Sequence, residues 1–267
     1  MKNSDSWRWA PIAAVAIAAV LVAGGCSPSG DDAGVPEQSA ADSRVEGPPA
    51  PAVESARSVD GETVRGSADY DYDVASSVVE AAQAARTVVA GTVVSWTEGR
   101  AVRDGDDQRL SAVLEVLIDQ AFATEEPVET IFVEVQRRGV LVDEAGNVLE
   151  LDEGASYDER SVSDLENAVP IGTRVLVLAV DAPSDEEIAA TGGGQQVVTS
   201  WSAPRDGAEL VSPLPQGLLF EDADGTYVSG VADQADVEHG QWPAAQQARG
   251  TGALFEQLLA ELSTELE

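Results

Sequence analysis

The sequence predicts a mainly β fold: a small antiparallel Greek-key barrel or sandwich, with a short helix before it and an amphipathic helix after it. About seven to nine short segments rich in apolar and β-branched residues lie between residues 87 and 231, and turn residues separate them. Little helical periodicity intervenes between these segments, which favours antiparallel pairing. We therefore expect a β-rich globular domain over residues 70–235.

The short helix is expected at the start of this domain. Ser77 is followed three residues later by Glu80, the spacing of a capping box. The alanine-rich run that continues to Arg86 favours a helix. One or two further helical turns are expected over residues 161–169.

The strands follow from apolar and β-branched residues between turn signals. Gly91 predicts a bulge in the first strand, and the polar run 97–108 predicts a loop. The continuous apolar run 175–180 predicts a strand that is buried on both faces. Prolines 204, 213 and 215 predict an irregular stretch. The expected strands are 87–96, 109–121, 128–136, 140–142, 148–151, 173–181, 196–201, 218–220 and 227–231.

Residues 236–267 are expected to form a polar hinge followed by the amphipathic helix, which occupies 250–267. Thr251 is the expected N-cap, and the apolar stripe consists of Leu254, Phe255, Leu258, Leu259, Leu262 and Leu266. Two interpretations remain open at this point. The stripe docks onto the β domain, or it stays exposed and binds a partner or a second copy.

The order of the β segments resembles the small Greek-key barrels of the OB type, and similar modules occur in uncharacterised bacterial lipoproteins. The segments that carry this resemblance are 88–94, 110–118, 131–135 and 172–180. An OB-like barrel does not imply nucleic-acid binding here, because 48 acidic residues against 15 basic ones give a net charge of −33.

The first 26 residues resemble a bacterial lipoprotein signal. An apolar run over residues 12–23 has the length of a signal-peptide core, and small residues follow it up to Cys26, the single cysteine of the chain. The resemblance implies that residues 1–25 are removed, that the Cys26 thiol is acylated, and that membrane lipid holds the protein on the extracytoplasmic face of the cell membrane. The alternative is an uncleaved signal anchor.

Residues 26–69 are expected to be a disordered acidic tether. This stretch contains five prolines and, from Ser27 onward, nine acidic residues against three arginines, with no aromatic residue. Such a composition buries too little apolar area to offset the entropy of ordering the chain.

Two acidic turns are candidate oxygen ligands for Ca²⁺. The first contains Asp104, Asp106 and Asp107, and the second contains Asp222 and Asp224. Neither matches an EF-hand loop, and the competing interpretation is that Asp and Gly simply suit tight turns.

No catalytic signature stands out. One cysteine and one histidine, His239, exclude an intramolecular disulfide, a cysteine-based zinc site and an H-E-x-x-H motif. The tryptophans at 96, 201 and 242 form either a binding patch or parts of the core.

The function expected from the sequence is a membrane-anchored, non-catalytic interaction module with no cofactor, no nucleic acid and an envelope protein as its partner. The alternative is a solute- or Ca²⁺-binding lipoprotein. A third interpretation is an enzyme of a type the sequence does not identify.

Overall fold

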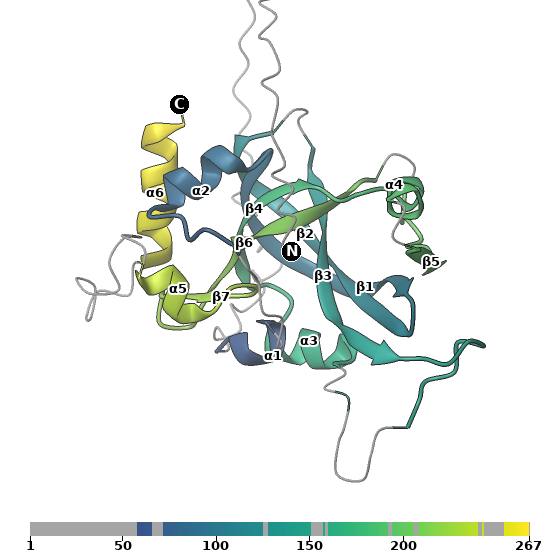
Figure 1. Cartoon of the computed structure of the whole chain (residues 1–267). Helices are drawn as coiled ribbons and strands as arrows, with labels where there is room; N and C mark the ends of the chain where they lie inside the picture. Colours follow the sequence, from purple (N-terminus) through teal and green to yellow (C-terminus); the bar gives the residue numbers. More distant parts are fainter. Residues whose placement is uncertain are drawn as a thin grey trace, which may run out of the picture. The chain divides into compact units, whose positions relative to one another are not determined.

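A computed structural model describes residues 58–65, 72–124, 128–150, 157, 160–191, 194–205, 208–239, 242 and 254–266. The strands are β1 (Thr87–Asp104), β2 (Asp107–Ala123), β3 (Thr130–Leu141), β4 (Arg174–Asp181), β5 (Gln196–Thr199), β6 (Leu210–Glu221) and β7 (Tyr227–Ser229). The helices are α1 (Gly61–Arg65), α2 (Val78–Ala84), α3 (Val162–Ala168), α4 (Asp185–Ala190), α5 (Gln234–His239) and α6 (Leu254–Glu265) (Figure 1).

Five of the strands pair in a circuit. β1 pairs with β2, β2 with β3, β3 with β6, β6 with β4, and β4 with β1. The β3–β6 pair is parallel and covers only Phe132–Val133 against Leu210–Val211, whereas the other four pairs are antiparallel. β5 and β7 extend this arrangement by pairing with β1 and β6. The expected mainly β fold class, with a short helix before the strands and a helix after them, is confirmed.

The first hairpin is longer than the sequence predicted. The expected loop at 97–108 is wrong, because β1 and β2 continue to a two-residue turn in which Asp104 pairs with Asp107. Gly105 has a φ of 63° at the first turn position, where a type II′ turn requires a positive φ. Polar residues mark this stretch because the outer part of a hairpin is exposed, and not because pairing stops.

Bulges and prolines bend the strands. The predicted bulge at Gly91 is confirmed by a register shift after Ala90, and a Cβ atom at Gly91 would lie 2.2 Å from the carbonyl oxygen of Leu117. The expected irregular stretch around Pro213 and Pro215 is wrong, because both prolines lie within β6. They fall where the β4–β6 register shifts, a position where a strand tolerates the missing N–H.

β4 separates two apolar clusters, as its continuous apolar run predicted. Val175, Val177 and Ala179 face the cluster inside the strand circuit. Leu176 and Leu178 point the opposite way into a second cluster. All five side chains are fully buried.

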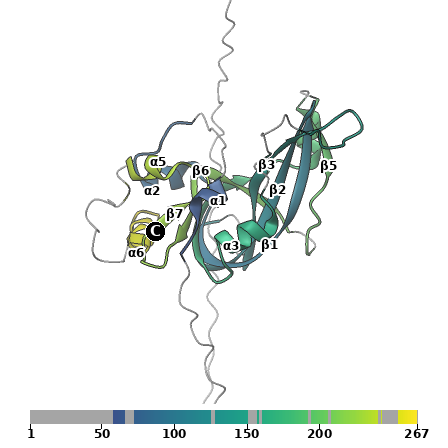
Figure 2. The ribbon, with the colours of Figure 1, turned by 90° about the horizontal axis from the view of Figure 1, so that it is seen from below.

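Helices cover the second cluster. α2, α5 and α6 lie on the side of β4 and β6 that faces away from β5 (Figure 2). The predicted α6 stripe packs there, since Leu254, Phe255, Leu258, Leu259 and Leu262 are buried. The Arg174 guanidinium lies over the Phe255 ring at 5.2 Å and pairs with Glu221 and Glu256. This packing decides between the two interpretations of the helix in favour of docking; the expected N-cap Thr251 lies outside the described residues.

Local capping signals are largely confirmed. Ser77 caps α2, and its hydroxyl accepts the Glu80 backbone N–H at 3.1 Å. The Glu80 carboxylate, however, accepts from Ser76 and not from Ser77, so the reciprocal half of the box is displaced by one residue. Hydrogen bonds from the Ser76 hydroxyl and backbone N–H lower the pKa of Glu80. Ser161 completes a full capping box with Asp164 on α3.

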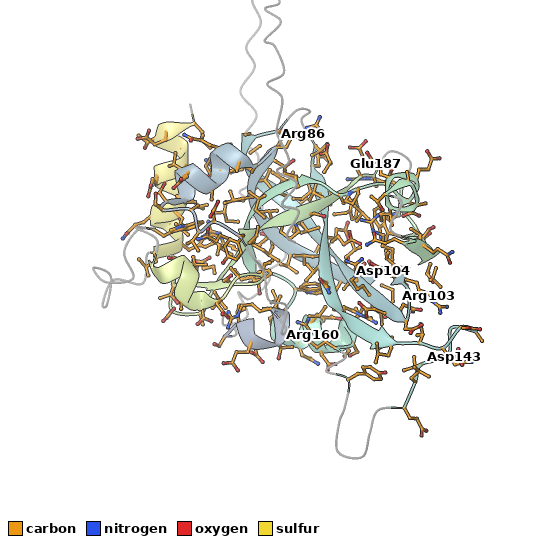
Figure 3. The ribbon with its side chains drawn as sticks, viewed as in Figure 1. Arg86, Arg103, Asp104, Asp143, Arg160 and Glu187 are labelled. Atoms are coloured by element: carbon orange, nitrogen blue, oxygen red, sulfur yellow. The ribbon has the colours of Figure 1, made fainter. Side chains whose placement is uncertain are left out.

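The domain begins before residue 70, so the expected tether boundary is wrong at its C-terminal end. Val59 and Val64 are buried in the inner cluster. Arg160 joins α1 to β3, because its guanidinium donates to the carbonyls of Thr63 and Val64 and to the carbonyl of Arg137 (Figure 3). In sequence, Arg160 is 97 residues from Thr63 and 96 residues from Val64, so the order of α1 depends on a distant part of the chain.

The expected hinge also begins later than predicted. α5 includes 236–239, and the Trp242 side chain is buried with its Nε1 donating to the Ala75 carbonyl at 3.0 Å. Residues 1–57, which include Cys26, lie outside the described part of the chain. None of the helices that the structure describes is long and apolar enough to cross a bilayer.

Candidate functional site

The outer face of β3 forms the floor of the candidate site. Ile131, Val133 and Val135 belong to the inner cluster, so the residues that alternate with them along β3 point outward. Two of the outward residues, Glu134 and Gln136, line a cavity of about 370 Å³.

A bulge in β1 brings an arginine to this floor. Gly99 and Arg100 together oppose Ser111, since Glu98 pairs with Ala112 and Ala101 with Leu110. Such a bulge redirects a side chain. Gly99 is required for the close approach, because a Cβ atom there would lie 2.4 Å from Ser111 Oγ.

Arg100 is held from several directions although its side chain is only 5 % exposed. Its Nε and Nη2 donate to the two oxygens of Glu134 at 2.7 and 2.6 Å, and its Nη1 donates to the Pro183 carbonyl at 2.5 Å. Ser111 Oγ accepts the Arg100 backbone N–H at 2.9 Å and lies 2.9 Å from Glu134 Oε1. Burial opposes the charge, but Glu134 and Asp185 outweigh it and raise the pKa of Arg100, which keeps the guanidinium charged.

Described residues of the connection between β4 and β6 roof the cavity. The connection contributes Pro183, Ile188 and Gln195 to the lining. α4 lies within it and begins with a capping box of Ser184 and Glu187 (Figure 3). The full lining is Arg100, Val102, Arg109, Leu110, Ser111, Glu134, Gln136, Pro183, Ile188, Gln195, Ser212, Pro213, Pro215 and Val231.

Aromatic contacts fix the far end of this roof. Trp201 packs on Phe132 with ring centroids 5.3 Å apart, and the Arg205 guanidinium lies 5.5 Å from the centre of the Phe132 ring. Arg205 also donates to the Thr130 carbonyl at 3.3 Å. A second cavity of about 630 Å³ lies beside these groups and is bordered by Thr124 and Val128, which flank residues outside the described chain.

The carboxylates proposed as metal ligands lie in two separate turns. At the β1–β2 turn, Asp104 accepts the Gln195 side-chain amide at 3.1 Å and lies 4.0 Å from Arg109 Nη2. At the β6–β7 turn, Asp222 accepts the Val59 backbone N–H at 2.9 Å. Hydrogen bonds from the Thr226 side chain and backbone lower the pKa of Asp224. The described residues contain no group of three His, Cys, Asp or Glu side chains placed to share a metal ion.

A second turn packs against the β1–β2 turn. Arg103 Nη2 donates to the Asp143 carbonyl at 2.8 Å (Figure 3). The expected hairpin after β3 is reduced to one bridge, Val142 with Val148. Three exposed apolar residues lie beside this bridge, Leu141, Val148 and Leu149, which are 42, 56 and 41 % exposed. Leu141 and Leu149 share one face, and Val148 lies opposite Val142 on the other. We call these three residues the hairpin patch.

The tryptophans do not form one patch. Trp96 lies in the inner cluster and Trp242 in the second, and Trp201 packs on Phe132. The side chain of His239 and all of Cys26 fall outside what the structure describes.

Sequence reasoning missed the cluster of Arg100, Ser111 and Glu134. Gly99 is the signal that points to it, because a glycine inside a strand marks a bulge as Gly91 does. Assigning 97–108 to a loop concealed that signal. No family model, no curated protein and no solved structure matches this chain.

Proposed function

We propose that this chain is a membrane-anchored extracytoplasmic lipoprotein whose OB-like domain is a non-catalytic interaction module for an envelope protein. Acylated Cys26 is the anchor, on the strength of the small-residue run that ends at the single cysteine. The described domain starts at Ser58, which leaves 27–57 between anchor and domain.

The state of the Glu134 carboxylate is the observation that carries the non-catalytic assignment. Glu134 is the one carboxylate in the described lining of the cavity. Both of its oxygens accept from Arg100, and Ser111 Oγ lies within hydrogen-bond distance of one of them. A general acid or base must reach the proton that it transfers. A carboxylate tied to a buried guanidinium in this way supports the walls of a binding site better than it serves as a base.

The hairpin patch is the surface that we assign to the partner. Leu141 and Leu149 are linked by a 2.8 Å backbone hydrogen bond, and the hydroxyl of Tyr157 donates to the Leu149 carbonyl at 2.9 Å. These bonds hold the apolar side chains in place although they face solvent. Exposed apolar groups on an ordered support are typical of protein contact surfaces.

In-cell photocrosslinking tests this assignment. A benzophenone amino acid at Val148 is expected to capture one reproducible envelope protein from intact cells. The same probe at Ile171 is the control, because Ile171 is 57 % exposed, as Val148 is 56 % exposed, but lies outside the patch. Equal capture from both positions, or none from Val148, would contradict the interaction module.

The anchor has its own test. Cys26→Ala is expected to abolish incorporation of an alkyne-palmitate label and to leave the signal segment uncut, since the thiol that accepts the acyl chain is gone. Ser27→Ala is the control and should be labelled as the parent chain is. Unchanged labelling of the Cys26→Ala chain would remove the lipoprotein assignment.

The cavity favours a second candidate, a solute-binding lipoprotein. Its volume of about 370 Å³ lies within the range of about 300–1,000 Å³ that is usual for small-molecule sites. A Ca²⁺-binding lipoprotein is less well supported. In the described residues the two acidic turns are separate, and Asp104 and Asp222 already accept hydrogen bonds from Gln195 and Val59.

A further inference from the structure

We infer that the cavity beneath Pro183, Ile188 and Gln195 binds an uncharged ligand with an apolar body and a few hydrogen-bonding groups. The inference rests on the solute-binding candidate and specifies its ligand class.

Each guanidinium group of the cavity wall lies near at least one carboxylate. Arg100 is bonded to Glu134 and lies 3.4 Å from an Asp185 oxygen. Arg109, which is 41 % exposed, lies 4.0 Å from Asp104. Glu134 is the one carboxylate of the lining, and Asp104 and Asp185 lie just outside it. The two guanidinium groups therefore lie within 4.0 Å of three carboxylates, and this surrounding charge does not favour an anion.

The rest of the protein adds to the exclusion of anions. The net charge of −33 gives a repulsive field to any negatively charged ligand. A cation fares poorly for a different reason: the carboxylate at the floor, Glu134, is already bonded to Arg100 through both oxygens. Burying an ion without a partner costs far more than burying a neutral group.

The uncharged lining matches a neutral ligand. Seven lining residues are apolar: Val102, Leu110, Pro183, Ile188, Pro213, Pro215 and Val231. Four others carry neutral amide or hydroxyl groups: Ser111, Gln136, Gln195 and Ser212. Amides and hydroxyls both donate and accept hydrogen bonds, so they orient a neutral polar group without charge.

A matched pair of fluorescent probes tests the ligand class. N-phenyl-1-naphthylamine is uncharged, and 1-anilinonaphthalene-8-sulfonate has the same ring system with one added sulfonate. Titrated into the full chain at physiological salt, the uncharged probe is expected to bind about tenfold or more tightly, because the sulfonate must approach three carboxylates and a protein of strongly negative net charge.

Two filling variants place the probe in the cavity. Gln136→Trp and Ser212→Trp are each expected to weaken binding of the uncharged probe by about fivefold or more, because an indole ring occupies the space. Ile171→Trp is the control and should leave binding unchanged, since Ile171 is exposed and outside the lining. Gln136 is exposed, so its variant is expected to fold even if Ser212→Trp does not, and thermal melting checks both.

The outcomes separate the two proposals. If the sulfonate probe binds as tightly as the uncharged one and both filling variants weaken it, the cavity binds solutes but the uncharged class is wrong. If neither probe binds, or the filling variants change nothing, the solute-binding candidate itself falls.

Discussion

Leu258→Ala is expected to lower the free energy of unfolding by about 2–5 kcal/mol, the usual cost of removing a buried leucine side chain. Leu258 is fully buried in the middle of α6, in the cluster that joins this helix to α2 and to the outer sides of β4 and β6. Urea unfolding followed by circular dichroism measures the change.

Gln257→Ala is the control for this prediction. Gln257 is exposed on the same helix, and alanine is a slightly better helix former, so stability should stay within about 0.5 kcal/mol. If Leu258→Ala and Gln257→Ala behave alike, α6 does not contribute its apolar face to the domain. The partner-binding interpretation of the C-terminal helix would then return.

Arg100→Met is expected to cost about 3–5 kcal/mol, because it leaves Glu134 only 15 % exposed and without its partner. The variant also removes the bond to the Pro183 carbonyl, which attaches the roof of the cavity. Arg109→Met is the comparison: its carboxylate partner is 4.0 Å away and both groups are exposed, so the change should stay below about 1 kcal/mol.

The double variant Arg100→Met with Glu134→Met isolates the pair. Replacing both charges with apolar groups of similar size is expected to recover much of the stability that the single change loses. Urea unfolding of the four chains in this cycle gives the coupling. A double variant as unstable as the sum of its two single variants would show that the ion pair does not hold the floor together.

Local patterns predicted much of the fold. The alternation and β-branched content of the strands, the apolar run of β4, the capping residue of α2, the helical turns at 161–169 and the apolar stripe of α6 are each confirmed. Each depends on neighbours within a few residues, or on a periodicity that one face of an element imposes. Lipidation at Cys26 stays a prediction from sequence.

Long-range contacts decided what the sequence missed. α1 lies where composition predicted a tether, because Arg160, 96 residues further along the chain than Val64, and the inner cluster stabilise it. α4 was not foreseen, although Ser184 and Glu187 carry its capping box. The prolines of β6 lie in a strand because β4 pairs beside them.

The candidate site likewise depends on long-range contacts that local sequence patterns do not specify. Arg100, Ser111 and Glu134 come from three strands, and nothing in the local sequence of one strand specifies the other two. The sequence by itself determined a β-rich acidic domain, an amphipathic C-terminal helix and a lipobox-like N-terminus, whereas the docking of that helix came from the structure. Only the tertiary structure brought an arginine and a glutamate 34 residues apart into one buried pair, because register and a glycine bulge set which outward side chains meet.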